Sequence, residues 1–123
     1  MKTTLVADVL APAEARGFVI AQLGSITLPS GVQSGDPVLV VSELVTNSVV
    51  AGASYIEVEV RVDDDRVELT VLDDARGWPT LQQSTSEDVN GRGLAIVEQL
   101  AHDWAVTSSE DGKSVTATWL ARG

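Results

Sequence analysis

Residues 55–73 read YIEVEVRVDDDRVELTVLD, and this stretch decides the fold of the chain. Apolar and charged residues alternate through Tyr55–Val62 and again through Arg66–Asp73, the period of strands with one buried face. The Asp63-Asp64-Asp65 segment between them is short and polar, so the two strands are expected to form an antiparallel hairpin. Three adjacent aspartates also suggest a cation cluster, but a solvated turn is the commoner structure for such a run.

The segments that flank the hairpin predict three helices and three further strands. Helices are expected over Pro12–Leu23, from Pro37 to about Ala51, and from Leu94 to about His102. Strands are expected at residues 3–8, Trp104–Ser108 and Lys113–Leu120. The pattern is that of an α+β fold.

Helix-terminus signals mark the second helix, and a long loop lies behind the hairpin. Asp36 is expected to be its N-cap, Pro37 its first residue and Gly52 its stop. Residues 74–93 are rich in polar residues and glycine without a clear period. A long irregular segment in a small domain is often a binding loop or lid, so it is a candidate site.

Length and composition narrow the classes of function. The chain has 123 residues, the size of one domain (1–123), and its 18 acidic and 8 basic residues give a net charge of -10. That charge disfavours direct binding of nucleic acid. The chain has no cysteine and a single histidine, His102, so disulfides are excluded and a histidine zinc site is disfavoured. No signal peptide or membrane span is recognisable, and we expect a cytoplasmic protein without membrane contact.

Three groups of polar residues stand out against the apolar pattern. Glu43 and Asn47 lie one turn apart on one face of a valine-rich helix, either as a solvent-facing stripe or as a base beside a magnesium ligand. Asp73 has the parity of the buried strand face, so it either starts a turn or accepts a hydrogen bond from a ligand. Gly91-Arg92-Gly93 precedes a helix, as a plain junction or as an anion-binding terminus.

The order of these elements resembles the GHKL ATPase superfamily, in particular the single-domain anti-sigma-factor serine kinases. Residues 43–47, ELVTN, are similar to its N box, and residues 73–77, DDARG, to its first glycine box. Residues 91–94, GRGL, are similar to the second glycine box, and residues 112–115 to the last hairpin. The resemblance implies a two-layer α/β sandwich with a mixed, mostly antiparallel sheet and about three helices on one face.

The resemblance also implies ATP and Mg²⁺ as cofactors and gives each matching residue a role. Glu43 would be the base that activates a partner's serine, and Asn47 would bind magnesium. Asp73 would accept a hydrogen bond from the adenine amino group, with Gly77 beside the base and Ser114 supporting it. The residues that would hold the phosphates, beneath a lid at about 78–90, are Gly91, Arg92, Gly93 and Leu94.

The chain departs from the family pattern at a few positions. Ala75 replaces a glycine of the first glycine box, and Val50 and Ala51 replace residues that are often basic or histidine. An interaction module with little or no ATP turnover is therefore the alternative to a kinase. Arg76, Arg92 and Lys113 are the basic residues expected to offset the phosphate charge.

The resemblance further implies protein partners, a sigma factor or an anti-sigma antagonist, and leaves a homodimer open. The acidic surface, which includes residues 63–65, suits a basic partner.

Overall fold

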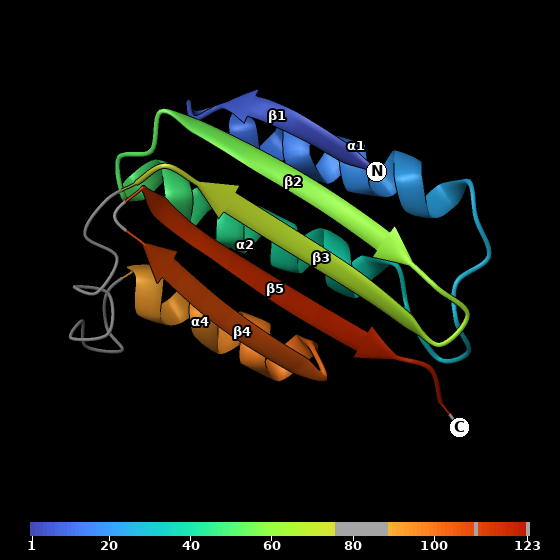
Figure 1. Ribbon diagram of the computed structural model, residues 1–123. Coiled ribbons are helices and arrows are strands. Elements are labelled where there is room, and N and C mark those ends of the chain that lie inside the picture. Colours follow the sequence, from blue (N-terminus) through green and yellow to red (C-terminus); the bar gives the residue numbers. More distant parts are fainter. Residues whose placement is uncertain (76–88, 110, 123) are drawn as a thin grey trace.

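A computed structural model describes residues 1–75, 89–109 and 111–122; for residues 89–94 and 109 the description covers the backbone alone. The elements follow one another as β1 Lys2–Val6, α1 Ala11–Gly24, α2 Gly35–Val50, β2 Tyr55–Val62, β3 Arg66–Asp73, α4 Val89–Leu100, β4 Asp103–Ser109 and β5 Gly112–Leu120 (Figure 1). The predicted α+β class is confirmed, and the β2–β3 hairpin has the bounds that its alternation predicts.

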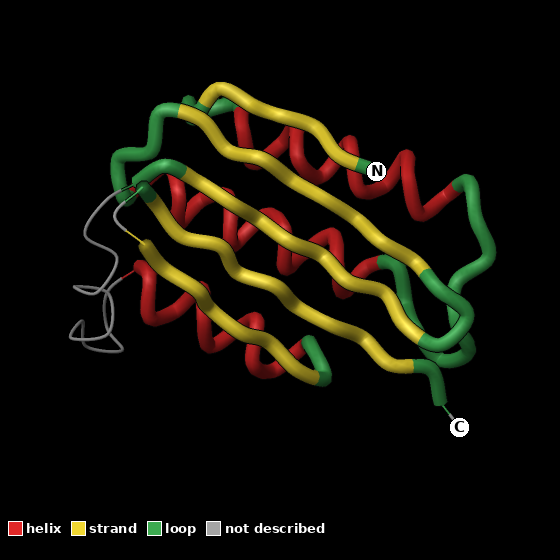
Figure 2. The backbone as a smooth tube through the Cα atoms, in the orientation of Figure 1, coloured by secondary structure: helices red, strands yellow, loops and turns green. Residues whose placement is uncertain are grey.

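The strands form one five-stranded sheet in the order β1-β2-β3-β5-β4 (Figure 2). All four pairings between the described strands are antiparallel, so the expected sheet is antiparallel throughout rather than mixed. Strand β5 lies between β3 and β4, and α4 belongs to the connection that crosses from β3 to β4. The chain thereby brings the end of β3 beside the start of β5.

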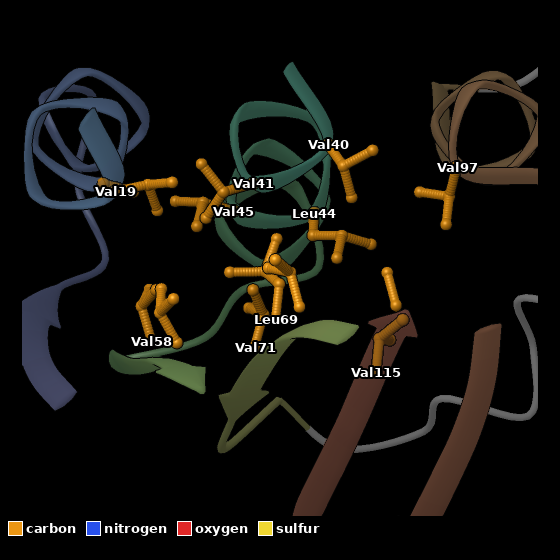
Figure 3. Packing of buried hydrophobic residues seen from close by; sticks show 14 of the residues in the cluster. Val19, Val40, Val41, Leu44, Val45, Val58, Leu69, Val71, Val97 and Val115 are labelled. Carbon is orange, nitrogen blue, oxygen red and sulfur yellow. The ribbon is translucent and has the colours of Figure 1, made fainter. Parts of the chain in front are cut away.

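The three described helices cover one face of the sheet, and α2 lies between α1 and α4 (Figure 1). In Figure 3, Val19 of α1 and Val97 of α4 approach α2 from opposite sides, and Leu69 and Val115 meet it from the sheet. Burying one such aliphatic side chain contributes about 1.5–3 kcal/mol. Valine therefore packs in the helical layer as well as in the sheet, and tertiary packing overrides its weak helix propensity in α2.

Each described helix begins before its predicted first residue, and the difference at α2 changes the predicted N-cap. Helix α2 begins at Gly35 after Ser34, which makes no side-chain capping bond, so the prediction of Asp36 as N-cap is wrong. Asp36 instead lies in the first turn, where a carboxylate is favoured by the helix dipole. Gly52 follows the helix with φ 90°, as its predicted role as a stop requires. No helix among the described residues is long and apolar enough to span a bilayer.

Candidate functional site

Asp73 is the last residue of β3, and its side chain is buried beneath the helical layer. The residue is 2% exposed, as the parity of the strand predicts. Its Oδ1 accepts a hydrogen bond from the Ala75 amide at 3.0 Å, and its Oδ2 accepts one from the Ser48 hydroxyl of α2. The bond from the Ala75 amide, two residues on, is that of an aspartate that starts a turn, and the burial shows that this aspartate is also enclosed by the fold.

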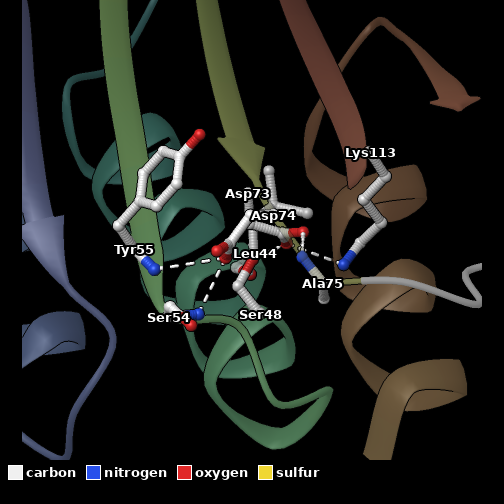
Figure 4. A network of polar contacts seen from close by, with 8 residues as sticks. All are labelled: Leu44, Ser48, Ser54, Tyr55, Asp73, Asp74, Ala75 and Lys113. Atoms are coloured by element: carbon white, nitrogen blue, oxygen red, sulfur yellow. Dashed lines mark hydrogen bonds and ion pairs between the residues drawn. The ribbon is translucent and has the colours of Figure 1, made fainter. Parts of the chain in front are cut away.

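Lys113 completes the surroundings of this carboxylate (Figure 4). Its Nζ donates to Asp73 Oδ2 at 2.8 Å, and the two side chains are only 6% and 1% exposed. Lys113 is expected from the sequence to offset phosphate charge, but its ammonium is directed to Asp73. The pairing register puts Lys113 directly opposite Asp73, and its parity with Val115 and Ala117 was the sequence signal for an inward lysine.

Gly112 makes this close approach of the two strands possible. Its φ is 146°, and a Cβ added there would lie 1.9 Å from the Asp73 carbonyl oxygen. Only glycine combines that backbone conformation with such contact. The glycine thus lets β5 begin against the end of β3, which places Lys113 opposite the carboxylate.

Helix α2 contributes the residues of the predicted N box. Asn47 is 4% exposed, and among the described residues no group hydrogen-bonds its carboxamide. A buried amide without a partner is costly, so this side chain is suited to a ligand. Its oxygen is a hard donor of the kind that Mg²⁺ prefers, and the residue therefore fits a magnesium site.

Glu43 lies one turn before Asn47 on the same helix. It is half-buried, and none of the described residues forms an ion pair or hydrogen bond with its carboxylate. The carboxylate is thus available to accept a proton. Glu43 and Asn47 thus lie on one side of a helix whose buried residues, apart from Asn47 and Ser48, are apolar.

The enclosed space that Asn47 and Ser48 line is small. A cavity of about 10 Å³ lies between α2 and the sheet. It is lined by Leu44, Asn47, Ser48, Val71, Val106, Lys113 and Val115. Such a volume holds about one water molecule, whereas sites for small ligands span about 300–1,000 Å³.

Ser114 does not join this cluster. It pairs with Leu72 and Thr107, so it lies on the sheet face opposite Asp73 and Lys113. It lines an open hollow of about 280 Å³, whose lining also includes Tyr55, Asp73 and Lys113. The support of adenine by Ser114 stays a prediction.

The Asp74 side chain links the segment between α2 and β2 to the end of β3 through hydrogen bonds. Its Oδ1 accepts hydrogen bonds from the amides of Ser54 at 2.7 Å and Tyr55 at 3.2 Å (Figure 4). The Ser54 amide, and to a lesser extent that of Tyr55, lowers the pKa of the Asp74 carboxyl below its ordinary value of 3.8. Asp74 therefore positions the backbone on which Asp73 and Ala75 sit.

Ala75, which replaces a glycine of the predicted first glycine box, introduces no backbone strain. Apart from glycines, no described residue has a positive φ, so the methyl group of Ala75 meets no left-handed backbone. Ala75 is 5% exposed and contributes its amide to Asp73. Gly77, Arg76 and most of the expected lid lie outside the described residues.

The second glycine box lies in α4, which begins at Val89 and not at Leu94 as expected. Residues 91–94 thus belong to the first turns of the helix, and their side chains lie outside the described part. Helix α4 packs beside α2, so this N-terminal segment runs next to the helix that carries Asn47 (Figure 1).

At the other end of the hairpin, Asp63, Asp64 and Asp65 are exposed, and the Asp63 amide donates to the Arg66 carbonyl. Among the described residues no group of three or more acidic, histidine or cysteine side chains is arranged to hold a metal ion. The turn is therefore a solvated one.

Comparison with known proteins agrees with this geometry. The model of the histidine kinase-like ATPase domain matches residues 6–119. The chain belongs to this family. Membership implies ATP binding and confirms the resemblance drawn from the sequence motifs. No curated protein sequence matches the chain.

A solved structure is similar over the whole chain. It is that of the RsbU and RsbW domains of Rv1364c from Mycobacterium tuberculosis, with a TM-score of 0.70 and 23% sequence identity. The match covers 100% of the present chain and 33% of the other, so the present chain spans a third of that protein chain. The likeness establishes the shared fold.

Proposed function

We propose that this domain binds ATP with Mg²⁺ between α2 and the Asp73 end of the sheet and transfers the γ-phosphoryl group to a serine or threonine of a partner protein. The observation that supports this most strongly is the carboxamide of Asn47, which is 4% exposed, has no hydrogen-bond partner among the residues that the structure describes, and lines the same cavity as Lys113. Burying a carboxamide without a hydrogen-bond partner lowers the stability of the fold, so Asn47 on a largely apolar helix is better explained by binding of a ligand than by a role in stability.

Each residue of the site would act through its own chemistry. The Asp73 carboxylate would accept a hydrogen bond from the amino group of adenine, and the Asn47 oxygen would hold magnesium, which neutralises phosphate charge. The half-buried Glu43 carboxylate would take the proton of the attacking hydroxyl. Phosphoryl transfer needs mainly positioning and charge neutralisation, and these residues supply both.

A protein-interaction module without turnover is the second candidate. It is favoured by the Lys113 ion pair, which already occupies Asp73, and by the small volume of the cavity, about 10 Å³. In that case the acidic surface would act alone, without nucleotide.

The proposed partner is a sigma factor or an anti-sigma antagonist. Acidic residues on the uncovered sheet face and at the hairpin turn suit a basic partner surface; they include Glu57, Glu59, Glu68 and residues 63–65. Charge complementarity would mainly accelerate association. Association that does not weaken as salt rises would count against this role of the acidic surface.

Calorimetry with ATP and Mg²⁺ tests the nucleotide site. We expect Asn47→Ala to weaken binding at least about tenfold, because the magnesium ligand is lost. The control Gln33→Ala removes an exposed carboxamide before α2 and should leave affinity unchanged. Absence of binding by the wild-type protein at millimolar ATP would refute the proposal.

A transfer assay with labelled ATP and a captured partner tests the chemistry. Glu43→Gln should abolish phosphoryl transfer while nucleotide affinity changes little, because the base acts only in the reaction. Full transfer by that variant would refute the assignment of Glu43 as the base.

A further inference from the structure

Lys113 is a buried cation that the proposed chemistry does not use. Its side chain is 6% exposed, and its Nζ lies 2.8 Å from Asp73 Oδ2. A lysine enclosed to this degree is rare unless it is paired, and the carboxylate is the partner that the described residues provide. The pair therefore ties β5 to the end of β3 in the nucleotide-free protein.

The carboxylate of Asp73 is nearly saturated in this state. Oδ2 accepts from both Lys113 and Ser48, and Oδ1 accepts from the Ala75 amide. A carboxylate offers about four acceptor positions, so one remains, on Oδ1. The oxygen on the Lys113 side has no capacity left for a ligand.

Lys113 also limits the cavity between α2 and the sheet. It lines the cavity of about 10 Å³ together with Ser48 and Val71. A purine is far larger than the single water that fits there. Movement of the Lys113 side chain would free Oδ2 and enlarge the cavity in one step.

We propose that Lys113 competes with the nucleobase for Asp73 Oδ2: its ammonium must leave that oxygen before the amino group of adenine binds to it. This inference rests on the proposed nucleotide site. The paired state is then incompetent for the base, and the apparent affinity for ATP falls by the fraction of molecules in which the pair is open.

The expected effect of Lys113→Met follows from that relation. If one molecule in ten or fewer has the pair open, removing the ammonium should strengthen ATP binding about tenfold or more. Methionine keeps an unbranched apolar chain of similar length and cannot bond to Asp73. The matched control is Lys2→Met, which removes the same charge from a surface pair with Glu57 at 3.8 Å and should leave ATP affinity unchanged.

Calorimetry of both variants and the wild type with ATP and Mg²⁺ separates the outcomes. Tighter ATP binding by Lys113→Met than by the wild type, with unchanged binding by Lys2→Met, supports the competition. If the wild type binds and Lys113→Met binds equally or more weakly, the competition is refuted while the nucleotide site stands. If neither binds at millimolar ATP, the proposed function fails, and the competition fails with it.

A second measurement uses the wild-type protein and does not depend on the folding of the variant. The chain has two lysines, so selective ¹⁵N labelling of lysine side chains gives one NMR signal from Lys113 and one from the exposed Lys2. We expect the Lys113 ammonium protons to be protected from exchange without nucleotide and to lose that protection in saturating ATP and Mg²⁺. Retention of the same signal and protection in the ATP-bound protein would overturn the proposal.

Discussion

The two ends of the β2–β3 hairpin carry the same residue type in opposite states. At the turn, Asp63, Asp64 and Asp65 are exposed and lie beside the surface side chain of Arg66. At the other end, Asp73 is 2% exposed and is held by Lys113. The strand alternation and the partners around an aspartate, rather than the residue type, therefore decide whether it belongs to a solvated turn or to a buried cluster.

The largest expected contrast comes from deleting a carboxylate at each end. Asp73→Ala leaves the Lys113 ammonium buried without its partner, which should cost about 3–5 kcal/mol of the free energy of unfolding. Asp64→Ala removes an exposed carboxylate and should change it by less than about 0.5 kcal/mol. Urea denaturation of the two variants and the wild type measures both effects.

A double variant sharpens this contrast. Asp73→Leu with Lys113→Met replaces the buried pair by apolar side chains and should lose less stability than Asp73→Ala alone. Equal losses of stability in Asp73→Ala and Asp64→Ala would contradict the role of the Asp73–Lys113 pair. A double variant that is less stable than Asp73→Ala would contradict it as well.

A smaller effect is expected from two glycines with positive φ. Gly112→Ala should cost about 2–4 kcal/mol, because a Cβ would meet the Asp73 backbone at 1.9 Å in addition to the φ strain. Gly52→Ala has φ 90° and open space around the new methyl group, so it should cost only about 1–2 kcal/mol. Thermal denaturation compares the two. Similar losses would mean that the close approach of β5 to Asp73 is not needed.

The smallest effect concerns Asp74 at low pH. Its carboxyl pKa is lowered in the folded protein by the Ser54 and Tyr55 amides, so its stabilisation is present above the unfolded value of 3.8 and is lost as pH falls through the folded one. Asp74→Asn should therefore reduce stability at neutral pH and make its decline below about pH 4 less steep. Urea denaturation across pH 2–7 gives this comparison, with Asp64→Asn as the control at the exposed turn. If Asp74→Asn leaves the decline of stability at low pH unchanged, the lowered pKa of Asp74 is refuted as a cause of that decline.

The sequence predicts best the strands, in which apolar and polar residues alternate with a period of two. The alternation in β2 and β3 gave the hairpin bounds and the inward direction of Asp73, since successive strand residues face opposite sides. It could also have indicated Lys113, but lysine is so often exposed that parity alone does not identify a buried one. Ser114 was assigned by resemblance, and the register places it on the other face.

Helix N-termini were the least predictable boundaries. Asp36 followed by Pro37 is a strong start signal, yet α2 begins at Gly35 because the preceding residues already adopt helical geometry. Helix α4 begins before Gly91 and Gly93, although two glycines weaken a helix. Its packing beside α2 outweighs local propensity, and such packing is not visible in one sequence.

The central claim, that the Asp73 end of the sheet binds nucleotide and the turn end does not, is tested most directly by amide NMR during titration with ATP and Mg²⁺. We expect the amide signals of Ser48, Ala75 and Lys113 to shift in a saturable manner while those of residues 63–65 remain unchanged. Shifts confined to the turn end, or no saturable shift at any of these amides at millimolar ATP, would contradict it.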